Sequence, residues 1–313
     1  MDGSLNVLLG RGDGTFDNAE LAGPRRRPTA LALADFDGDG RQDLVVTHSV
    51  VVDKPILALG RGDGTFGAPS ELSVPGESQT DVVVGYFDDD ARPDIIVANQ
   101  YTHDLTALLN RGAGGFTTLQ MASKAQPQSL ALGYLEPDSG IDLLVGVWSL
   151  GGVRVIPMRG SGLGWFSPFP EFDPEVFPGA IAVADLNRDD HPDIVVAGGI
   201  GVHVRRGQQA ILEYEPGRTW TVDGSASGLV VADLDRDGNL DVAVACPDAS
   251  AVEVLFGAGD ATFSRRQRFP VGLTPLRLLA RDLNGDGRVD LAVANRDSNS
   301  VSILLASARR ACH

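Results

Sequence analysis

The sequence of 313 residues has few cysteines and no long hydrophobic run. Two cysteines, Cys246 and Cys312, cannot define a disulfide framework, and the sequence leaves open whether they pair. No stretch of about 18 apolar residues predicts a transmembrane helix. The opening residues, Met1–Ser4, have neither the basic start nor the apolar core of a signal peptide, so none is predicted.

Basic residues are also scarce. The chain has 26 Lys and Arg against 42 Asp and Glu, which gives a formal net charge of −16. A nucleic-acid partner would require clustered Lys and Arg to meet the phosphates. The composition therefore predicts no nucleic-acid partner, and it directs attention to where the acidic residues are.

Acidic residues gather in a nine-residue loop that runs from Asp35 to Asp43. Carboxylates stand at positions 1, 3, 5 and 9 of this loop, and Gly40 at position 6 allows a left-handed backbone. Two carboxylates ~4 Å apart repel by about 4 kcal/mol at an effective dielectric near 20, so the loop is expected to take a cation. Oxygen ligands on alternate residues are typical of calcium. The flanks, residues 31–34 and 44–46, read as strands, so the loop is a β–β turn and not an EF-hand.

The loop recurs at a nearly constant spacing. Its six copies begin at residues 35, 86, 134, 185, 233 and 282. Two copies are eroded: they begin with Tyr86 and Tyr134, and the second has Glu136 at position 3. A period of about 50 residues is the sequence sign of a propeller or a repeat array.

A glycine-rich turn, Gly60–Phe66, is repeated along the chain as well and predicts a hairpin. One whole unit, residues 28–75, then reads as four antiparallel strands: Thr29–Ala34, Leu44–Thr47, Ile56–Leu59 and roughly Phe66–Val74. Four such strands make a propeller blade. The first strand is apolar on both faces with small residues interleaved, so we expect it to be packed between neighbouring sheets.

We therefore expect an all-β chain, a single β-propeller domain over residues 1–313 with four-stranded antiparallel blades. The repeats lie near residues 28–75, 76–126, 127–177, 178–224, 225–273 and 274–306, with a partial repeat at 1–23. Six blades are expected, in a ring closed by the N-terminal strand near residues 16–23. Seven blades with one incomplete, or a piece of a longer chain, are the alternatives.

Together, the acidic loop and the glycine turn resemble the FG-GAP repeats, also called VCBS repeats. These occur in integrin α-subunit propellers, in some lectins and in many secreted bacterial proteins. The resemblance covers essentially the whole chain. It implies a β-propeller, bound Ca²⁺ and an extracellular or cell-surface location. It is much less specific for function, because propellers serve many functions.

The resemblance also implies which residues bind calcium. The side-chain ligands would be Asp35, Asp37, Asp39 and Asp43; Asp185, Asn187, Asp189 and Asp193; Asp233, Asp235, Asp237 and Asp241; and Asp282, Asn284, Asp286 and Asp290. Main-chain carbonyls would come from Arg41, His191, Asn239 and Arg288. Sites in the two eroded loops are doubtful, and their acids are Asp88, Asp90, Asp94, Glu136, Asp138 and Asp142. The alternative for every loop is a network of Asx turns without an ion.

Function is expected on the loops that differ from blade to blade, since a rigid scaffold usually carries function on its loops. These loops lie on the face opposite the acidic loops. Candidate ligand-binding residues there are Asn99, Tyr101, Trp148 and Asn295. An aromatic ring with amide groups suits a protein or a glycan ligand.

We therefore expect a calcium-stabilised, non-catalytic binding, adhesion or scaffold module, a monomeric domain with no catalytic residue. One alternative is a polysaccharide-active enzyme such as a lyase, which should show paired acids or a histidine and an acid in one pocket. Contact of Asp104, Asp248 or Asp297 with a histidine would favour it. Another is a structural part of a larger surface protein.

Overall fold

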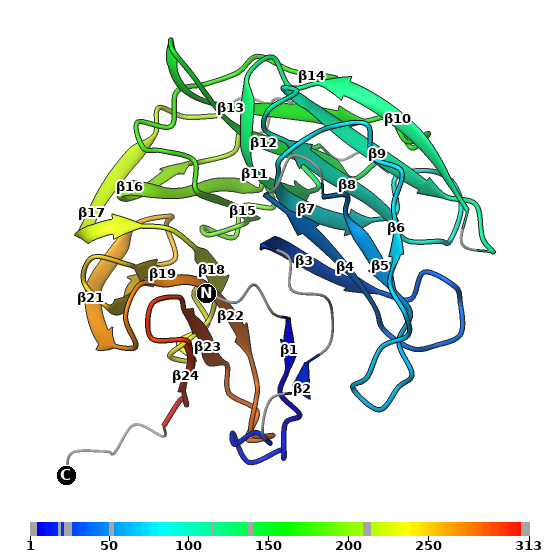
Figure 1. Ribbon diagram of the computed structural model, residues 1–313. Coiled ribbons are helices and arrows are strands. Elements are labelled where there is room, and N and C mark those ends of the chain that lie inside the picture. Colours follow the sequence, from blue (N-terminus) through cyan, green and yellow to red (C-terminus); the bar gives the residue numbers. More distant parts are fainter. Residues whose placement is uncertain are drawn as a thin grey trace. The chain divides into compact units, whose positions relative to one another are not determined.

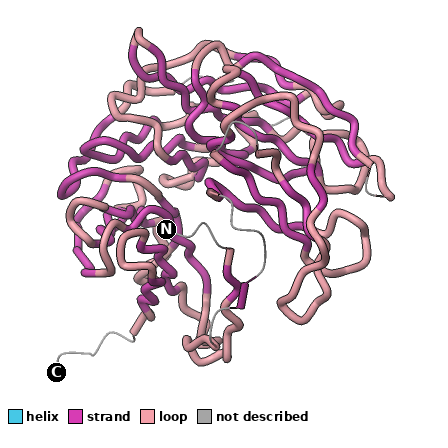
Figure 2. Tube along the Cα trace, viewed as in Figure 1, coloured by secondary structure: helices cyan, strands magenta, loops and turns pink. Residues whose placement is uncertain are grey.

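The computed structural model describes residues 5–17, 20–21, 27–49, 53–113, 115–136, 140–208 and 214–307. Strands and loops make up this part of the chain, with no helix (Figure 2). Consequently, none of the described residues lies in a helix that is long and apolar enough to cross a membrane. The chain is a six-bladed β-propeller that divides into two compact units, Met1–Leu9 with Asn18–Pro174 and Gly10–Asp17 with Glu175–His313.

The first unit contains three four-stranded antiparallel blades (Figure 1). Their strands are β3 (Pro28–Ala34), β4 (Asp43–His48), β5 (Ile56–Ala58) and β6 (Ser70–Glu71); β7 (Gln79–Gly85), β8 (Asp94–Asn99), β9 (Asp104–Asn110) and β10 (Phe116–Ala122); and β11 (Gln126–Gly133), β12 (Asp142–Ser149), β13 (Gly152–Gly160) and β14 (Phe166–Pro168). Each blade follows the predicted order, in which the acidic loop joins the first two strands and the glycine turn joins the last two.

The second unit contains the other three blades. Their strands are β15 (Ala180–Ala184), β16 (Asp193–Arg205) and β17 (Arg218–Ala226); β18 (Leu229–Ala232), β19 (Asp241–Cys246), β20 (Ala251–Gly257) and β21 (Phe263–Pro270); and β22 (Pro275–Arg281), β23 (Asp290–Asn295) and β24 (Ser300–Leu304). In the fourth blade the long strand β16 spans the positions of the second and third strands. In the sixth blade three strands are described, and β24 is the last of them.

The hydrophobic core lies between neighbouring blades. In the first unit one cluster joins Phe36 and Val45 of the first blade to Ile95 and Val97 of the second. Equivalent clusters join the second blade to the third, the fourth to the fifth, and the fifth to the sixth. Each blade is therefore stabilised by apolar burial against its neighbours, at about 25 cal/mol per Å².

The burial of the strands differs from the expectation for the first strand of each blade. The second strands β4, β8 and β19 are buried along their whole length, whereas β3 is only half-buried, with Leu31 55% exposed. The reason is topological. A first strand lies at one edge of its sheet and has one hydrogen-bonded neighbour, while a second strand lies between two.

The N-terminal segment also differs in detail from the expectation. The strand expected near residues 16–23 to complete the last blade is seen over Glu20–Leu21, as β2, and it pairs with β1 (Asn6–Val7) in a sheet of two strands. Pairing with a strand that is close in sequence requires only a short loop, which costs little closure entropy.

Candidate metal centres

The backbone of each intact acidic loop is wrapped by two residues in the left-handed region. Gly38 and Gly40 have φ of 78° and 84°, at positions 4 and 6. The same two positions have positive φ in the other intact loops, at Arg188 and Asp190, Arg236 and Gly238, and Gly285 and Gly287. The sequence predicted this only for position 6. Position 4 was missed because arginine stands there in two copies, and a non-glycine residue in this region is uncommon.

This wrapping turns backbone N–H groups toward the first carboxylate. Asp35 accepts hydrogen bonds from the N–H groups of Gly38, Asp39 and Gly40 at 2.8, 3.1 and 2.8 Å. Asp37 and Asp39 each accept one from the residue two positions further on. Asp185 and Asp282 accept the same three N–H groups in their loops. The predicted Asx-turn network is therefore present, and its hydrogen bonds fix the orientation of the carboxylates.

The geometry of two intact loops fits one bound cation. One oxygen from each of Asp35, Asp37 and Asp39 lies within 4.8 Å of the others, and the same holds for Asp233, Asp235 and Asp241. Ligands 2.3–2.6 Å from a calcium ion are at most about 5 Å apart, so these oxygens can share one ion. Moreover, Oδ1 of Asp233 is buried and has no hydrogen-bond partner in the described structure. An anionic oxygen in that state is stabilised by a cation.

The loops that begin at Asp185 and Asp282 have asparagine at position 3. The amide of Asn187 donates to Asp189 at 2.8 Å, and the amide of Asn284 donates to Asp286 at 3.3 Å. The backbone wrap and the position-1 contacts match those of the first loop. These loops therefore keep the same donor set with one negative charge fewer.

The aspartate at position 9 has a contact that sequence reasoning did not foresee. Asp43 accepts the N–H of Phe36 in its own loop and the N–H of Gly60 in the glycine turn, both at 2.8 Å. All six blades have this pair of bonds, at 2.7–3.0 Å, made by Asp43, Asp94, Asp142, Asp193, Asp241 and Asp290. We call this the position-9 bridge. It ties the acidic loop to the backbone at or just after the end of the third strand in every blade, whether or not the rest of the loop is intact.

Burial shifts the pKa of three of these position-9 aspartates. Desolvation raises the pKa of Asp94 and Asp241 and raises the pKa of Asp193 to about 6, although the two backbone N–H groups partly oppose it. The folded pKa of Asp193 is thus above its unfolded value of about 4. In the absence of a cation, protonation of Asp193 therefore stabilises the folded state. This contribution is fully present below pH ~4 and is lost as the pH rises through about 6.

The two eroded loops hold an arginine among their acids. In the second loop Nη1 of Arg111 lies 2.6 Å from Asp88 and 3.6 Å from Asp90. In the third, Nη2 of Arg159 lies 3.2 Å from the buried carboxylate of Glu136. Asp89 and Ala91, at positions 4 and 6 of the second loop, are not among the residues with positive φ. Asp88, Asp90 and Asp94 still cluster within 4.8 Å, but a side-chain cation already faces two of them. Asp138 lies outside the described residues.

We expect replacement of Arg111 by glutamine to cost about 1 kcal/mol of stability, because an exposed ion pair with a charge-assisted hydrogen bond is worth about that much. Chemical denaturation measures it. Arg61→Gln is the matched control, since Arg61 occupies the equivalent position and its hydrogen bond goes to Thr65. A loss no larger than that of the control would contradict the role of Arg111.

The candidate ligand residues on the variable loops fall into two groups. Tyr101 and Trp148 are 68% and 41% exposed. Asn99 and Asn295 are buried, which the sequence did not foresee. The amide of Asn99 donates to Asp104 and Thr106, and the amide of Asn295 donates to Ser300 and Ser302, so both asparagines brace the turn beneath the surface. Sequence reasoning missed Leu150, which is fully exposed beside Trp148.

The acids that a lyase would use are engaged elsewhere. Asp104 accepts from Asn99, Asp248 accepts from Ser225, and Asp297 binds Arg296 and Thr274. No hydrogen bond to a histidine is seen for these three within the described residues. Cys246 is buried, and burial raises the pKa of its thiol to about 12. Cys312 lies outside the described residues, so its pairing stays open.

Comparison with known proteins shows which repeat family and which folds this chain is similar to. The FG-GAP-like repeat family matches residues 1–46 and 233–293. The fold is similar to that of a protein from Lactobacillus plantarum, with a TM-score of 0.64 and 16% identity over 93% of this chain and 87% of that one. It is also similar to BBS1N, crystallised in complex with ARL6DN, with a TM-score of 0.55 and 12% identity over 90% and 92% of the two chains. At these identities the likeness shows the fold alone. No curated protein matches the sequence.

Proposed function

We propose that this β-propeller, part of which matches FG-GAP-like repeats, is a calcium-stabilised, non-catalytic binding or scaffold module. The observation that carries the proposal is the contrast between its two sets of loops. Acidic loops and glycine turns repeat one architecture in blade after blade, whereas the loops at the other end of the strands present different side chains in each blade. Such a division is expected where one face maintains the scaffold and the other recognises a ligand.

Calcium is the cation we propose for the four intact loops. Hard carboxylate and amide oxygens, with a main-chain carbonyl at position 7, are the ligands that calcium prefers. The proposed ligands are those that the sequence analysis names for these loops, with the position-9 aspartates as both ligands and bridges. Each loop joins two strands of one blade, so the ion would stabilise the fold. A module of this kind suits an extracellular or cell-surface location, where calcium is abundant.

The proposed ligand site is the variable face, and in the first unit it is best represented by Tyr101, Trp148 and Leu150. These three residues are exposed, although large apolar side chains are normally buried. Tyr101 and Leu150 lie on the turns that follow β8 and β12, and Trp148 lies near the end of β12 itself. Aromatic and aliphatic side chains on rigid turns contribute contact area at low entropy cost, which suits a protein or a glycan ligand.

Binding to arrayed glycans and folded proteins tests this proposal in the presence of calcium. We expect the Tyr101→Ala/Trp148→Ala double variant to lose at least tenfold in affinity for any ligand found, with an unchanged melting temperature. Arg61→Ala, on an acidic-loop-side turn, is the control and should bind normally. Binding that survives the double variant would contradict this location. Formation of an unsaturated sugar product from bound polysaccharides would instead favour the lyase alternative.

A further inference from the structure

A cavity of about 670 Å³ opens in the first unit, between the acidic loops of the first and second blades. The first loop contributes Asp35, Asp37 and Gln42 to its wall, and the second loop contributes Tyr86 and Arg92. Apolar residues near the ends of strands β3 and β7 complete the wall. A volume of this size is within the range of small-molecule binding sites.

Two residues of this wall depart from the pattern that the repeats set. Position 1 of the acidic loop is aspartate in the four intact copies, whereas the second loop has Tyr86 there. Position 8 is polar in the first loop alone, where it is Gln42. The other five loops have Pro93, Ile141, Pro192, Leu240 and Val289 at position 8. The turn therefore forms without an amide at position 8 and without a ring at position 1, yet both line one cavity in this chain.

Both departures leave side chains that are available to a ligand. Gln42 is exposed, and its side-chain amide makes no hydrogen bond within the part of the chain that the structure describes. The side chain of Tyr86 is 62% exposed, although large aromatic residues are normally more buried. Tyr134 has the same exposure at position 1 of the third loop, but it is not among the described residues that line the cavity. An exposed ring and an unused amide on one wall are typical of a binding site.

The polar groups of the wall indicate the chemistry of the ligand. Nε of Arg92 donates to the carbonyl oxygen of Asn110 at 3.3 Å and lies 3.4 Å from Asp90, which leaves its two Nη atoms without a partner among the described residues. These Nη atoms only donate hydrogen bonds, the carboxylate of Asp37 only accepts them, and the amide of Gln42 does both. A hydroxyl group also donates and accepts, so a ligand with several hydroxyls can satisfy all three side chains.

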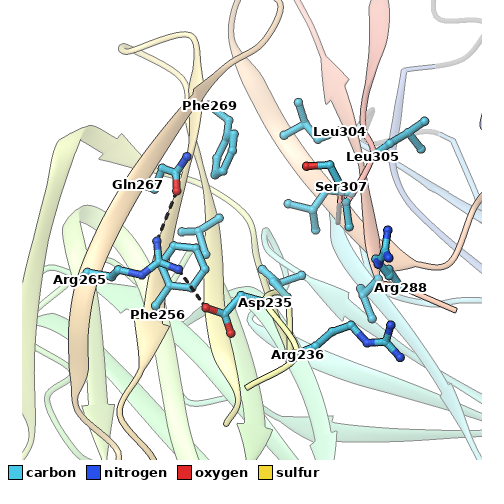
Figure 3. A pocket seen from close by; sticks show the side chains of 15 residues that line it. Asp235, Arg236, Phe256, Arg265, Gln267, Phe269, Arg288, Leu304, Leu305 and Ser307 are labelled. Carbon is cyan, nitrogen blue, oxygen red and sulfur yellow. Dashed lines mark hydrogen bonds and ion pairs between the residues drawn. The ribbon is translucent and has the colours of Figure 1, made fainter. Parts of the chain in front are cut away.

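A second cavity, between the fifth and sixth blades of the second unit, shows the contrast (Figure 3). Position 8 of the sixth loop is Val289 there, and most of the lining residues are apolar, among them Phe256 and Leu304. Arg265 is held by Asp235 at 2.9 Å and stacks on the ring of Phe256, with its guanidinium carbon 3.4 Å from the ring centroid. A cavity between two blades is thus not polar by default, and the polar wall in the first unit comes from its own side chains.

We propose that the cavity between the first and second acidic loops binds a short, neutral saccharide. The apolar C–H face of a sugar ring stacks on Tyr86, and its hydroxyl groups form hydrogen bonds with Gln42 and Arg92. An anionic sugar fits less well, because Asp35 and Asp37 stand on the same wall. This site lies on the side of the acidic loops, so it is separate from the proposed ligand site on the variable face.

Saturation-transfer NMR and titration with the methyl glycosides of glucose, galactose, mannose and N-acetylglucosamine test the proposal on the full chain with calcium present. We expect saturable binding of at least one of these sugars. Gln42→Leu and Tyr86→Ala should each weaken it at least fivefold. The melting temperature should not change, because both side chains are exposed and Leu240 stands at position 8 of the fifth loop. Tyr134→Ala removes an equally exposed tyrosine outside the cavity and should bind normally.

A second set of measurements separates this site from the variable face. The Tyr101→Ala/Trp148→Ala variant should bind the sugar as the wild-type chain does, and a matching loss there would overturn the location. Methyl glucuronide, which carries a carboxylate, should bind several-fold more weakly than methyl glucoside, and equal binding would contradict a neutral ligand. The proposal would also be overturned if none of the four glycosides bound at tens of millimolar concentration, or if Tyr134→Ala lost as much binding as Tyr86→Ala.

Discussion

Replacement of Asp94 by alanine is expected to lower the free energy of unfolding by about 2–6 kcal/mol. Asp94 is fully buried and accepts the N–H groups of Phe87 and Asn110, at 2.9 and 2.8 Å. Its removal leaves two buried donors without an acceptor, and each such group costs about 1–3 kcal/mol. A typical domain has only about 5–15 kcal/mol of stability, so the effect would be severe.

Asp94 is the best of the six aspartates for this measurement, because Arg111 already faces the acids of its loop and a metal contribution is least expected there. Urea denaturation of the purified chain gives the loss. Asp94→Asn keeps one acceptor oxygen and should lose roughly half as much. Asp89→Ala, an exposed acid of the same loop, should change stability by less than about 0.5 kcal/mol. A loss for Asp94→Ala as small as that of the control would refute the position-9 bridge.

The fold was predictable because its evidence is local and repeated. Each acidic loop and glycine turn is marked by residues close in sequence, and six copies in register fix the four-stranded blade. The second role of Asp94 was not predictable. The N–H of Asn110 is 16 residues away at the end of β9, and only the antiparallel pairing of β8 with β9 brings it within reach. The spacing of the acids suggested a ligand and gave no sign of a bridge.

Which side chains of the candidate ligand site are buried was harder to predict from the sequence. Asn99 ends strand β8 and Tyr101 lies on the turn that follows, yet the first is buried and the second is exposed. A loop has no fixed period that would tell these orientations apart, unlike a strand. Arg111 illustrates a different limit. In the second repeat, Tyr86 replaces the first acid of the loop and Arg111 follows the third strand, and together these residues could have indicated an arginine in place of the ion. The ion pair itself was not predictable, because it forms only where the acidic loop meets the turn after the third strand.

Calcium removal is expected to lower the melting temperature of the wild-type chain by at least 10 °C. A site whose free calcium is about tenfold above its dissociation constant adds ~1.4 kcal/mol, so four sites together add about 5–6 kcal/mol. In a chain of this size each kcal/mol shifts the melting temperature by roughly 2–4 °C. Thermal unfolding followed by circular dichroism, with calcium and with excess chelator, measures the shift. Titration calorimetry should give four ions per chain.

A matched pair of variants separates the ion from the turn network. Asp37→Ala removes a carboxylate from an intact loop, and its cost should be large with calcium but small in chelator, where the lost ligand no longer matters. Asp88→Ala removes the same position from the loop that Arg111 occupies, so its cost should be the same in both conditions. If chelator changed neither the wild-type melt nor the cost of Asp37→Ala, the acidic loops would be Asx-turn networks alone. The proposed extracellular setting would then lose its physical argument, while the position-9 bridges would remain to explain why an aspartate ends every loop.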